Sequence, residues 1–190
     1  GYDHKFGKNR EGNLQTFKKQ ASKYNYTVEE IPAQEIDDIN ISSTKIRKAL
    51  FDGNIKDATK YLGYFYSLHG KVVEGKKLGR TIGYPTANIQ LFDSEKLIPK
   101  TGVYLTEVTV GGVDYYGMMN IGFNPTTDSD NKLKLEVNIF NFDRAIYGDS
   151  IAVKLLERIR DEEKFNSIEE LKNKIKSDEI LCRQLIQQIG

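Results

Sequence analysis

The sequence contains no tryptophan, two methionines and a single cysteine, Cys182. One cysteine excludes an internal disulfide and fits the reducing cytoplasm. The sequence also lacks any long apolar run, which excludes a membrane-spanning helix. Its N-terminal segment has no apolar stretch of the kind found in secretion signals. We therefore expect a cytoplasmic protein without a membrane partner, in which Cys182 is a small buried residue on a helical apolar stripe.

The sequence also has no large excess of positive or of negative charge. Lys and Arg number 28 and Asp and Glu number 27, a net charge of +1, so no nucleic-acid partner is expected. The only histidines are His4 and His69. His69 has no second histidine or cysteine nearby in the sequence, so we expect a structural role for it rather than metal ligation or nucleophilic catalysis.

What is present indicates a folded protein. Hydrophobic residues make up 38% of the 190 residues, with eleven tyrosines and nine phenylalanines. This composition is typical of globular domains, and the length allows one large or two small ones. It does not determine the oligomeric state.

Helical and strand patterns alternate in the first third of the chain. Asn13 precedes a helical apolar pattern over residues 14–24 and is a suitable N-cap. Residues 26–31 indicate a strand, and residues 41–51 and 55–62 indicate two further helices. This α/β alternation, with polar loops at the helix starts, predicts part of a nucleotide-binding sheet domain over residues 1–64.

Short strands dominate from residue 65 onward. Gly111-Gly112 predicts a tight turn inside a hairpin, and Ser167 begins a capping box that opens the last helix. Residues 65–190 are therefore expected to be mainly β: a small antiparallel, Greek-key-like β-barrel with a C-terminal helix. The expected strands are residues 68–73, 103–110, 113–119, 133–140 and 151–155, with a loop at 120–131 and a helix that buries Ile168, Leu171, Ile175, Cys182, Leu185 and Ile189.

The segment between residues 70 and 88 combines glycines, basic residues and a rigid end. Glycines let backbone N–H groups turn toward an anion, and Lys76 and Arg80 add positive charge. Pro85 favours an extended backbone, which places Thr86 and Asn88 on the same side. Their hydroxyl and amide oxygens are ligands that Mg²⁺ accepts beside nucleotide phosphates. Glycine content alone would instead favour an ordinary hairpin turn.

A carboxylate stands in the clearest strand of the sequence. Over residues 133–139, Leu133, Leu135, Val137 and Ile139 share one face, whereas Lys134, Glu136 and Asn138 share the other. Glu136 therefore suits a general base that takes a proton from a hydroxyl. The alternative is an ordinary surface residue on an exposed strand face.

Several separated motifs follow one another in order over two-thirds of the chain. They are Gly-x-Val-Val-x-Gly at 70–75, Gly-Arg-x-Ile-Gly-Tyr-Pro-Thr-Ala-Asn at 79–88, Gly-Val-Tyr at 102–104, Asn-Ile-Gly-x-x-Pro-Thr at 120–126, Glu136 with Ile-Phe-x-Phe at 139–142, Tyr-Gly at 147–148 and Ile-Arg-x-Glu-x-Lys-Phe at 159–165. Together these motifs resemble riboflavin kinases, and more closely the kinase module of bacterial bifunctional riboflavin kinase/FMN adenylyltransferases (FAD synthetases). Such an ordered set is far more specific than one short pattern.

This resemblance implies an ATP:riboflavin 5′-phosphotransferase that uses Mg²⁺, takes riboflavin and ATP as substrates and forms FMN. It also implies the same barrel fold. Two rivals remain: the FAD-forming activity of a longer parent protein, and a non-catalytic flavin-binding barrel. The implied site has Glu136 as base, Thr86 and Asn88 as metal ligands that also contact ATP, Gly75, Lys76, Arg80, Asn141 and Tyr147 at the nucleotide, and Arg160 and Lys164 at the flavin. For Arg160 and Lys164 a charged cap before the last helix is the alternative, and for Tyr147 a turn contact beside Gly148.

Residues 1–64 resemble the last part of an FMN adenylyltransferase module. The matching motifs lie at 1–12 and at Ile-Ser-Ser-Thr-x-Ile-Arg, 41–47. The early His-x-Gly-His motif of that module is absent, and the chain starts at Gly1. We therefore expect residues 1–64 to be a partial α/β nucleotidyltransferase segment whose catalytic front half lies upstream or has been cut away, without adenylyltransferase activity in this fragment.

Overall fold

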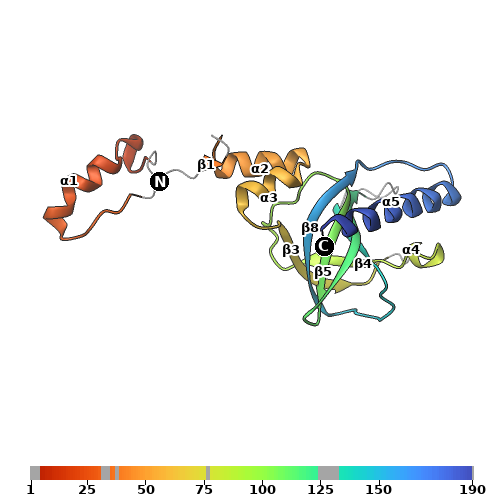
Figure 1. Ribbon diagram of the computed structural model, residues 1–190. Coiled ribbons are helices and arrows are strands. Elements are labelled where there is room, and N and C mark those ends of the chain that lie inside the picture. The colour runs from red at the N-terminus through yellow and green to blue at the C-terminus, as the bar shows by residue number, and fades with distance from the viewer. Residues whose placement is uncertain (1–4, 31–34, 37–38, 76–77, 124–132, 190) are drawn as a thin grey trace. The chain divides into compact units, whose positions relative to one another are not determined.

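The protein is described by a computed structural model that covers residues 5–30, 35–36, 39–75, 78–123 and 133–189. The chain forms two compact units, Gly1–Ser43 and Thr44–Gly190. Each unit is described by itself below. Figure 1 gives the element labels.

The second unit is built on a closed barrel of six strands (Figure 1). Every neighbouring pair is antiparallel, and the order around the barrel is β3-β4-β7-β6-β5-β8. This confirms the antiparallel barrel predicted from the strand patterns. The strands are β3 (Ser67–Val73), β4 (Ala87–Leu91), β5 (Gly102–Val110), β6 (Val113–Phe123), β7 (Leu133–Ile139) and β8 (Ser150–Arg160).

Alternating apolar residues fill the barrel interior. Leu68, Val108, Val137 and Val153 come from four different strands and are fully buried in one cluster. The β5–β6 hairpin turns through Gly111 and Gly112, whose φ angles of 57° and 80° explain why glycine occupies both positions. The predicted loop at 120–131 begins later than expected, because β6 continues to Phe123. Its remainder, 124–131, lies outside the described residues.

Helix α5 (Ile168–Ile189) covers part of the outer barrel surface (Figure 1). Cys182 is fully buried there in a second apolar cluster with Val103, Leu105 and Met118, as expected for a small core residue. Of the predicted capping box, the first half is confirmed, since Ser167 Oγ accepts from the Glu170 amide at 3.1 Å. In the second half, Glu170 Oε2 accepts from the Asn166 amide at 2.9 Å in place of the Ser167 amide. The predicted burial of the helix ends was wrong, because Ile168 and Ile189 are 61% and 51% exposed.

Two short helices, α2 (Ser43–Asp52) and α3 (Ile55–Leu62), confirm the helices predicted at 41–51 and 55–62. Leu50, Ile55 and Ala58 join the same core as the barrel interior. In packing terms, most of α2 and all of α3 therefore belong to the barrel unit. The module boundary predicted at residues 64–65 stays a prediction.

The first unit contains η1 (Lys8–Arg10), helix α1 (Leu14–Tyr24) and the two-residue strands β1 (Glu35–Ile36) and β2 (Ile39–Asn40). Asn13 caps α1 as predicted, and Phe6 stacks on Phe17 with ring centroids 4.1 Å apart. The strand predicted at 26–31 is wrong for its described part, since residues 26–30 pair with no strand. None of this unit's side chains whose burial the structure describes is buried.

Among the described residues, no helix has both the length and the apolar character needed to cross a membrane.

Candidate active site

The polar segment before β4 is fixed to β7 by a buried side chain. Asn138 is 9% exposed, and its Nδ2 donates to the Pro85 carbonyl oxygen at 2.7 Å. The pairing of β4 with β7 then places Asn88 opposite Glu136. The Thr86 hydroxyl lies 3.5 Å from Glu136 Oε2. The fold thus brings together Thr86, Asn88 and Glu136, which the sequence separates by about fifty positions.

One pocket, here called the helix-side pocket, lies between the outer barrel face and α5. Its volume of ≈ 360 Å³ suits a small molecule. Both polar and apolar side chains line this pocket. The polar lining includes Thr86, Asn88, Asn120, Lys134, Glu136 and Asn138, and the apolar lining includes Ile82, Val103, Met118, Phe165, Leu171 and Ile175.

A second pocket of ≈ 360 Å³, the loop-side pocket, is lined by the loop after β7. Arg80 and Arg144 contribute positive charge to it, and Tyr147 contributes a ring. Thr86 lines both pockets. A ligand in one pocket and a ligand in the other would therefore meet beside Thr86.

The glycine loop approaches this junction closely. A Cβ atom at Gly75 would lie 2.2 Å from Asn88 Nδ2, and one at Gly79 would lie 2.2 Å from the Tyr84 carbonyl oxygen. Glycine is therefore required at both positions for the loop to pass so close to the Tyr84–Asn88 segment. Lys76 lies outside the described residues.

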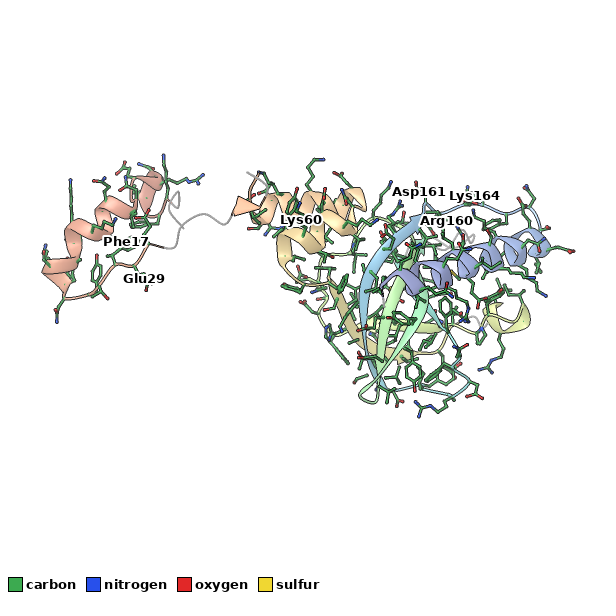
Figure 2. The ribbon with its side chains drawn as sticks, in the orientation of Figure 1. Phe17, Glu29, Lys60, Arg160, Asp161 and Lys164 are labelled. Atoms are coloured by element: carbon green, nitrogen blue, oxygen red, sulfur yellow. The ribbon has the colours of Figure 1, made fainter. Side chains whose placement is uncertain are left out.

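The remaining predicted residues divide between the two pockets and the surface. Arg80 and Tyr147 line the loop-side pocket, and Arg160 lines the helix-side pocket. Asn141 lines neither, and its Oδ1 accepts from Arg183 at 3.4 Å. Lys164 is exposed on the segment between β8 and α5 and also lines neither pocket (Figure 2).

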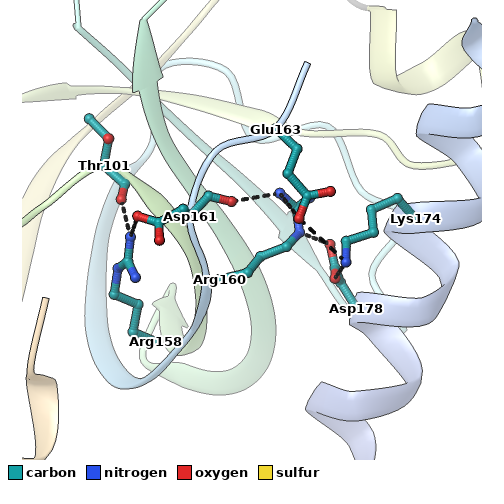
Figure 3. A network of polar contacts seen from close by, with 7 residues as sticks. All are labelled: Thr101, Arg158, Arg160, Asp161, Glu163, Lys174 and Asp178. Carbon is teal, nitrogen blue, oxygen red and sulfur yellow. Dashed lines mark hydrogen bonds and ion pairs between the residues drawn. The ribbon is translucent and has the colours of Figure 1, made fainter. Parts of the chain in front are cut away.

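Arg160 is held in an ion-pair network at the edge of the helix-side pocket (Figure 3). Its Nε donates to Asp178 Oδ2 of α5 at 2.7 Å, and its Nη1 donates to the Asp161 carbonyl oxygen at 2.9 Å. Asp178 is 4% exposed and also faces Lys174 at 3.9 Å. These contacts connect the end of β8 to the middle of α5.

Two titratable side chains of this region hold their protons firmly. Burial, helped by the Glu179 carboxylate, raises the pKa of Tyr84. Burial and the carboxylates of Asp178 and Glu179 raise the pKa of Cys182 to about 12. Cys182 is therefore a neutral thiol near pH 7 and is no candidate for a nucleophile.

Sequence reasoning missed several pocket residues. Lys134 and Asn138 lie on the polar face of β7 that the alternating pattern had already separated from the core, so that pattern was the available signal. Tyr84, Asn120 and Phe165 also line the helix-side pocket. They come from three separate segments, which no local pattern connects.

Comparison with known proteins gives two family matches. Residues 62–186 match the riboflavin kinase family, and residues 1–45 match the FAD synthetase family. Proteins named bifunctional riboflavin kinase/FMN adenylyltransferase are similar: that of Listeria monocytogenes is 40% identical over 94% of this chain and 56% of its own length. That of Bacillus subtilis is 39% identical, with the same coverage. The chain thus spans a little over half the length of these relatives.

A solved structure is also similar. It is the crystal structure titled macrolide-efflux protein from Streptococcus pneumoniae, with 39% sequence identity and a TM-score of 0.85. The match covers 96% of this chain and 58% of that protein.

Proposed function

This chain belongs to the riboflavin kinase family, and from that premise we propose that it transfers the γ-phosphoryl group of ATP to the 5′-hydroxyl of riboflavin. The products are FMN and ADP. One observation carries the proposal: Thr86 lies at the junction of the two pockets, with Glu136 and Asn88 beside it. An acceptor and a nucleotide bound in separate pockets would meet beside Glu136, the proposed base, and beside the oxygen atoms of Thr86 and Asn88, the proposed metal ligands.

Glu136 is the proposed general base. Its carboxylate takes the proton of the 5′-hydroxyl as that oxygen attacks the γ-phosphorus. The bond from the γ-phosphorus to the bridging oxygen breaks, and its electron pair leaves with ADP. The Thr86 hydroxyl and the Lys134 ammonium lie 3.5 Å and 4.0 Å from this carboxylate.

The loop-side pocket is the proposed nucleotide site. Arg80 supplies positive charge for the polyphosphate, Tyr147 supplies a ring, and Gly75 allows the backbone to approach Asn88. Lys76 is proposed to add a further charge contact. Asn141 is retained as a proposed nucleotide contact, although it lines neither pocket and would have to act from outside them.

The donor set at Thr86 and Asn88 fits Mg²⁺. A hydroxyl and an amide oxygen are neutral, hard ligands, and Mg²⁺ usually completes its shell with phosphate oxygens and water. The described residues hold no cluster of three His, Cys, Asp or Glu side chains that would form an all-protein metal site. When bound with ATP, Mg²⁺ neutralises the charge that develops on the phosphate oxygens. Thr86 and Asn88 are the residues that would hold it.

The helix-side pocket is the proposed riboflavin site. Its apolar lining and Phe165 suit a flat aromatic ring system, and Glu136 is part of the same lining. Arg160 is proposed to contact the flavin from the pocket edge. Lys164 is exposed, so its proposed contact would require the segment between β8 and α5 to bend toward the ligand.

The decisive experiment incubates the purified chain with riboflavin and Mg-ATP and separates riboflavin, FMN and FAD by chromatography. We expect FMN to accumulate. Riboflavin that binds but stays unphosphorylated would instead identify a non-catalytic flavin-binding barrel.

The match of residues 1–45 to the FAD synthetase family favours a second activity for a longer parent protein, namely transfer of AMP to FMN. We propose that residues 1–64 are part of such a module. The chain lacks a His-x-Gly-His motif, so we expect no FAD from it. FAD formed by the purified chain would contradict this expectation. The lone buried thiol is consistent with the cytoplasm, which remains our proposed location.

A further inference from the structure

Arg158, near the end of β8, is an arginine whose side chain is only 15% exposed. Its Nη2 donates both to the Thr101 carbonyl oxygen and to Asp161 Oδ1, each at 2.6 Å (Figure 3). Its Nε is buried, and no described residue accepts a hydrogen bond from it. The Arg158 guanidinium is therefore largely shielded from water and is held by two short hydrogen bonds.

Two glycines from distant segments make room for this side chain. A Cβ atom at Gly53, between α2 and α3, would lie 2.6 Å from Arg158 Cδ. A Cβ atom at Gly102, the first residue of β5, would lie 2.3 Å from the Arg160 carbonyl oxygen and 2.8 Å from Arg158 Nη2. A larger residue at Gly53 would displace the arginine, and one at Gly102 would collide with both the arginine and the Arg160 backbone. The turn between the two helices and the start of β5 thus form a fitted channel for Arg158.

Asp161 connects this channel to the helix-side pocket. Its carboxylate is shared between Arg158 at 2.6 Å and Lys100 at 3.0 Å, and both neighbours lower the pKa of Asp161. Its carbonyl oxygen accepts from Arg160, which in turn pairs with Asp178 of α5. Asp161 therefore has its carboxylate and its carbonyl oxygen fixed from opposite directions (Figure 3).

The residues that follow Asp161 form one side of the pocket. Glu162, Glu163 and Phe165 line it, and we call residues 161–165 the wall segment. Glu162 lies close against β6, since a Cβ atom at Gly122 would stand 1.7 Å from its Oε1. Small movements of Asp161 would therefore be transmitted to side chains that face the ligand.

We propose that Arg158 is a positioning residue for the acceptor: seated in the channel of Gly53 and Gly102, it fixes Asp161 and so sets the wall segment against the riboflavin ring. An apolar side chain of similar length would fill the channel without the cost of burying a charge. Such a side chain would remove the shorter of the two ion pairs of Asp161 and leave only the pair with Lys100. The inference rests on the proposed function, because it assigns riboflavin to the helix-side pocket.

The first test compares Arg158→Met and Asp161→Asn with wild type. Methionine keeps the length of the side chain and removes the donors. Riboflavin dissociation constants, measured by flavin fluorescence, should rise about 2- to 30-fold, the range usual for residues that act through a neighbour. The KM for ATP and the kcat at saturating riboflavin should stay near wild type, because the loop-side pocket contains no residue of the network.

A matched control lies on the same strands. Lys154 of β8 pairs with Glu107 of β5 and lines neither pocket, so Lys154→Met should leave riboflavin affinity unchanged. A double variant, Arg158→Met with Asp161→Asn, should weaken riboflavin binding no more than the stronger single variant. The reason is that each single variant already breaks the same ion pair, the one between Arg158 and Asp161. A fully additive loss would contradict the proposed route through Asp161.

The second test distinguishes the effect of blocking the channel on riboflavin binding from the effect of backbone strain. Gly53 and Gly63 end successive helices with φ angles of 77° and 78°, but a Cβ atom at Gly63 meets nothing within 4 Å. Gly53→Ala and Gly63→Ala therefore introduce the same strain, and only Gly53→Ala collides with Arg158. We expect weaker riboflavin binding for Gly53→Ala alone. Equal affinities for the two variants would overturn the role of the channel.

The outcomes distinguish this inference from the proposed function. A wild-type chain that binds no riboflavin overturns both. A wild-type chain that forms FMN, with Arg158→Met and Asp161→Asn variants that bind riboflavin equally well, overturns only the role of Arg158. Parallel losses in riboflavin affinity, ATP affinity and thermal stability would also overturn it, because they indicate general destabilisation.

Discussion

At the scale of single residues, the proposed chemistry depends most on Glu136. Glu136→Gln keeps the size of the side chain and removes its basicity. We expect kcat to fall by about 10²–10⁴-fold, the usual contribution of a general base. The lower end is favoured, because the attacking oxygen is only weakly bonded in a loose phosphoryl-transfer transition state. Steady-state FMN formation measures this, with riboflavin binding as the control. A variant with wild-type kcat would leave Glu136 as a surface residue.

Thr86 is the residue that both pockets share, so its substitution tests the proposed metal site. Thr86→Ala removes one oxygen ligand and should lower the rate strongly at a given Mg²⁺ concentration. The fold should persist, because the hydrogen bond from the Thr86 hydroxyl to Glu136 is long, at 3.5 Å. The measurement is a Mg²⁺ titration of FMN formation. A rate equal to wild type across the titration would exclude Thr86 as a ligand.

At the scale of elements, Asn138 connects β7 to the segment that enters β4. Asn138→Leu keeps the volume but removes the donor of the part-buried hydrogen bond to the Pro85 carbonyl oxygen, which should cost about 0.5–1.5 kcal/mol of unfolding free energy. Because Pro85 precedes Thr86, kcat should fall as well. Denaturant unfolding and FMN formation measure the two effects. An unchanged kcat in a folded variant would show that Thr86 keeps its place without this bond.

Helix α5 forms one side of the proposed riboflavin pocket, and its start depends on Ser167. Ser167→Ala removes the cap on the Glu170 amide and should destabilise the protein by about 0.5–2 kcal/mol. The exposed, mid-helix Ser177 provides the control. Ser177→Ala should stabilise slightly, because alanine has the higher helix propensity. Thermal unfolding of both variants checks this difference in sign. Equal shifts would contradict the capping role.

At the scale of the whole chain, the two units differ in how much they bury. The barrel unit has an extensive apolar core, whereas no side chain of the Gly1–Ser43 unit whose burial the structure describes is buried. A segment without a core cannot offset the entropy of ordering its backbone. We expect limited proteolysis to cleave within residues 1–43 first and to leave a resistant barrel fragment, identified by mass spectrometry. Protection of residues 1–43 equal to that of the barrel would contradict this expectation.

The sequence by itself determined the barrel, the hairpin turn, the terminal helix and the family. Those features follow from local chemistry: alternation places Val137 inside and Glu136 outside, paired glycines allow positive φ, and a serine caps a helix. The ordered motifs also identified candidate site residues. Local patterns were less accurate where packing decides, as at Ile168 and Ile189, which share the apolar pattern of α5 but are exposed in the structure.

Only the tertiary structure decided which candidates lie together. The β4–β7 pairing brings Thr86 and Asn88 to Glu136, whereas Asn141 and Lys164 lie outside both pockets. The proposed role of Arg158 could not be recognised from the sequence, because its channel is made by Gly53 and Gly102, which are distant from it and from each other along the chain. The physical reason is that strand pairing and side-chain packing join residues of large sequence separation, and no local propensity encodes those contacts.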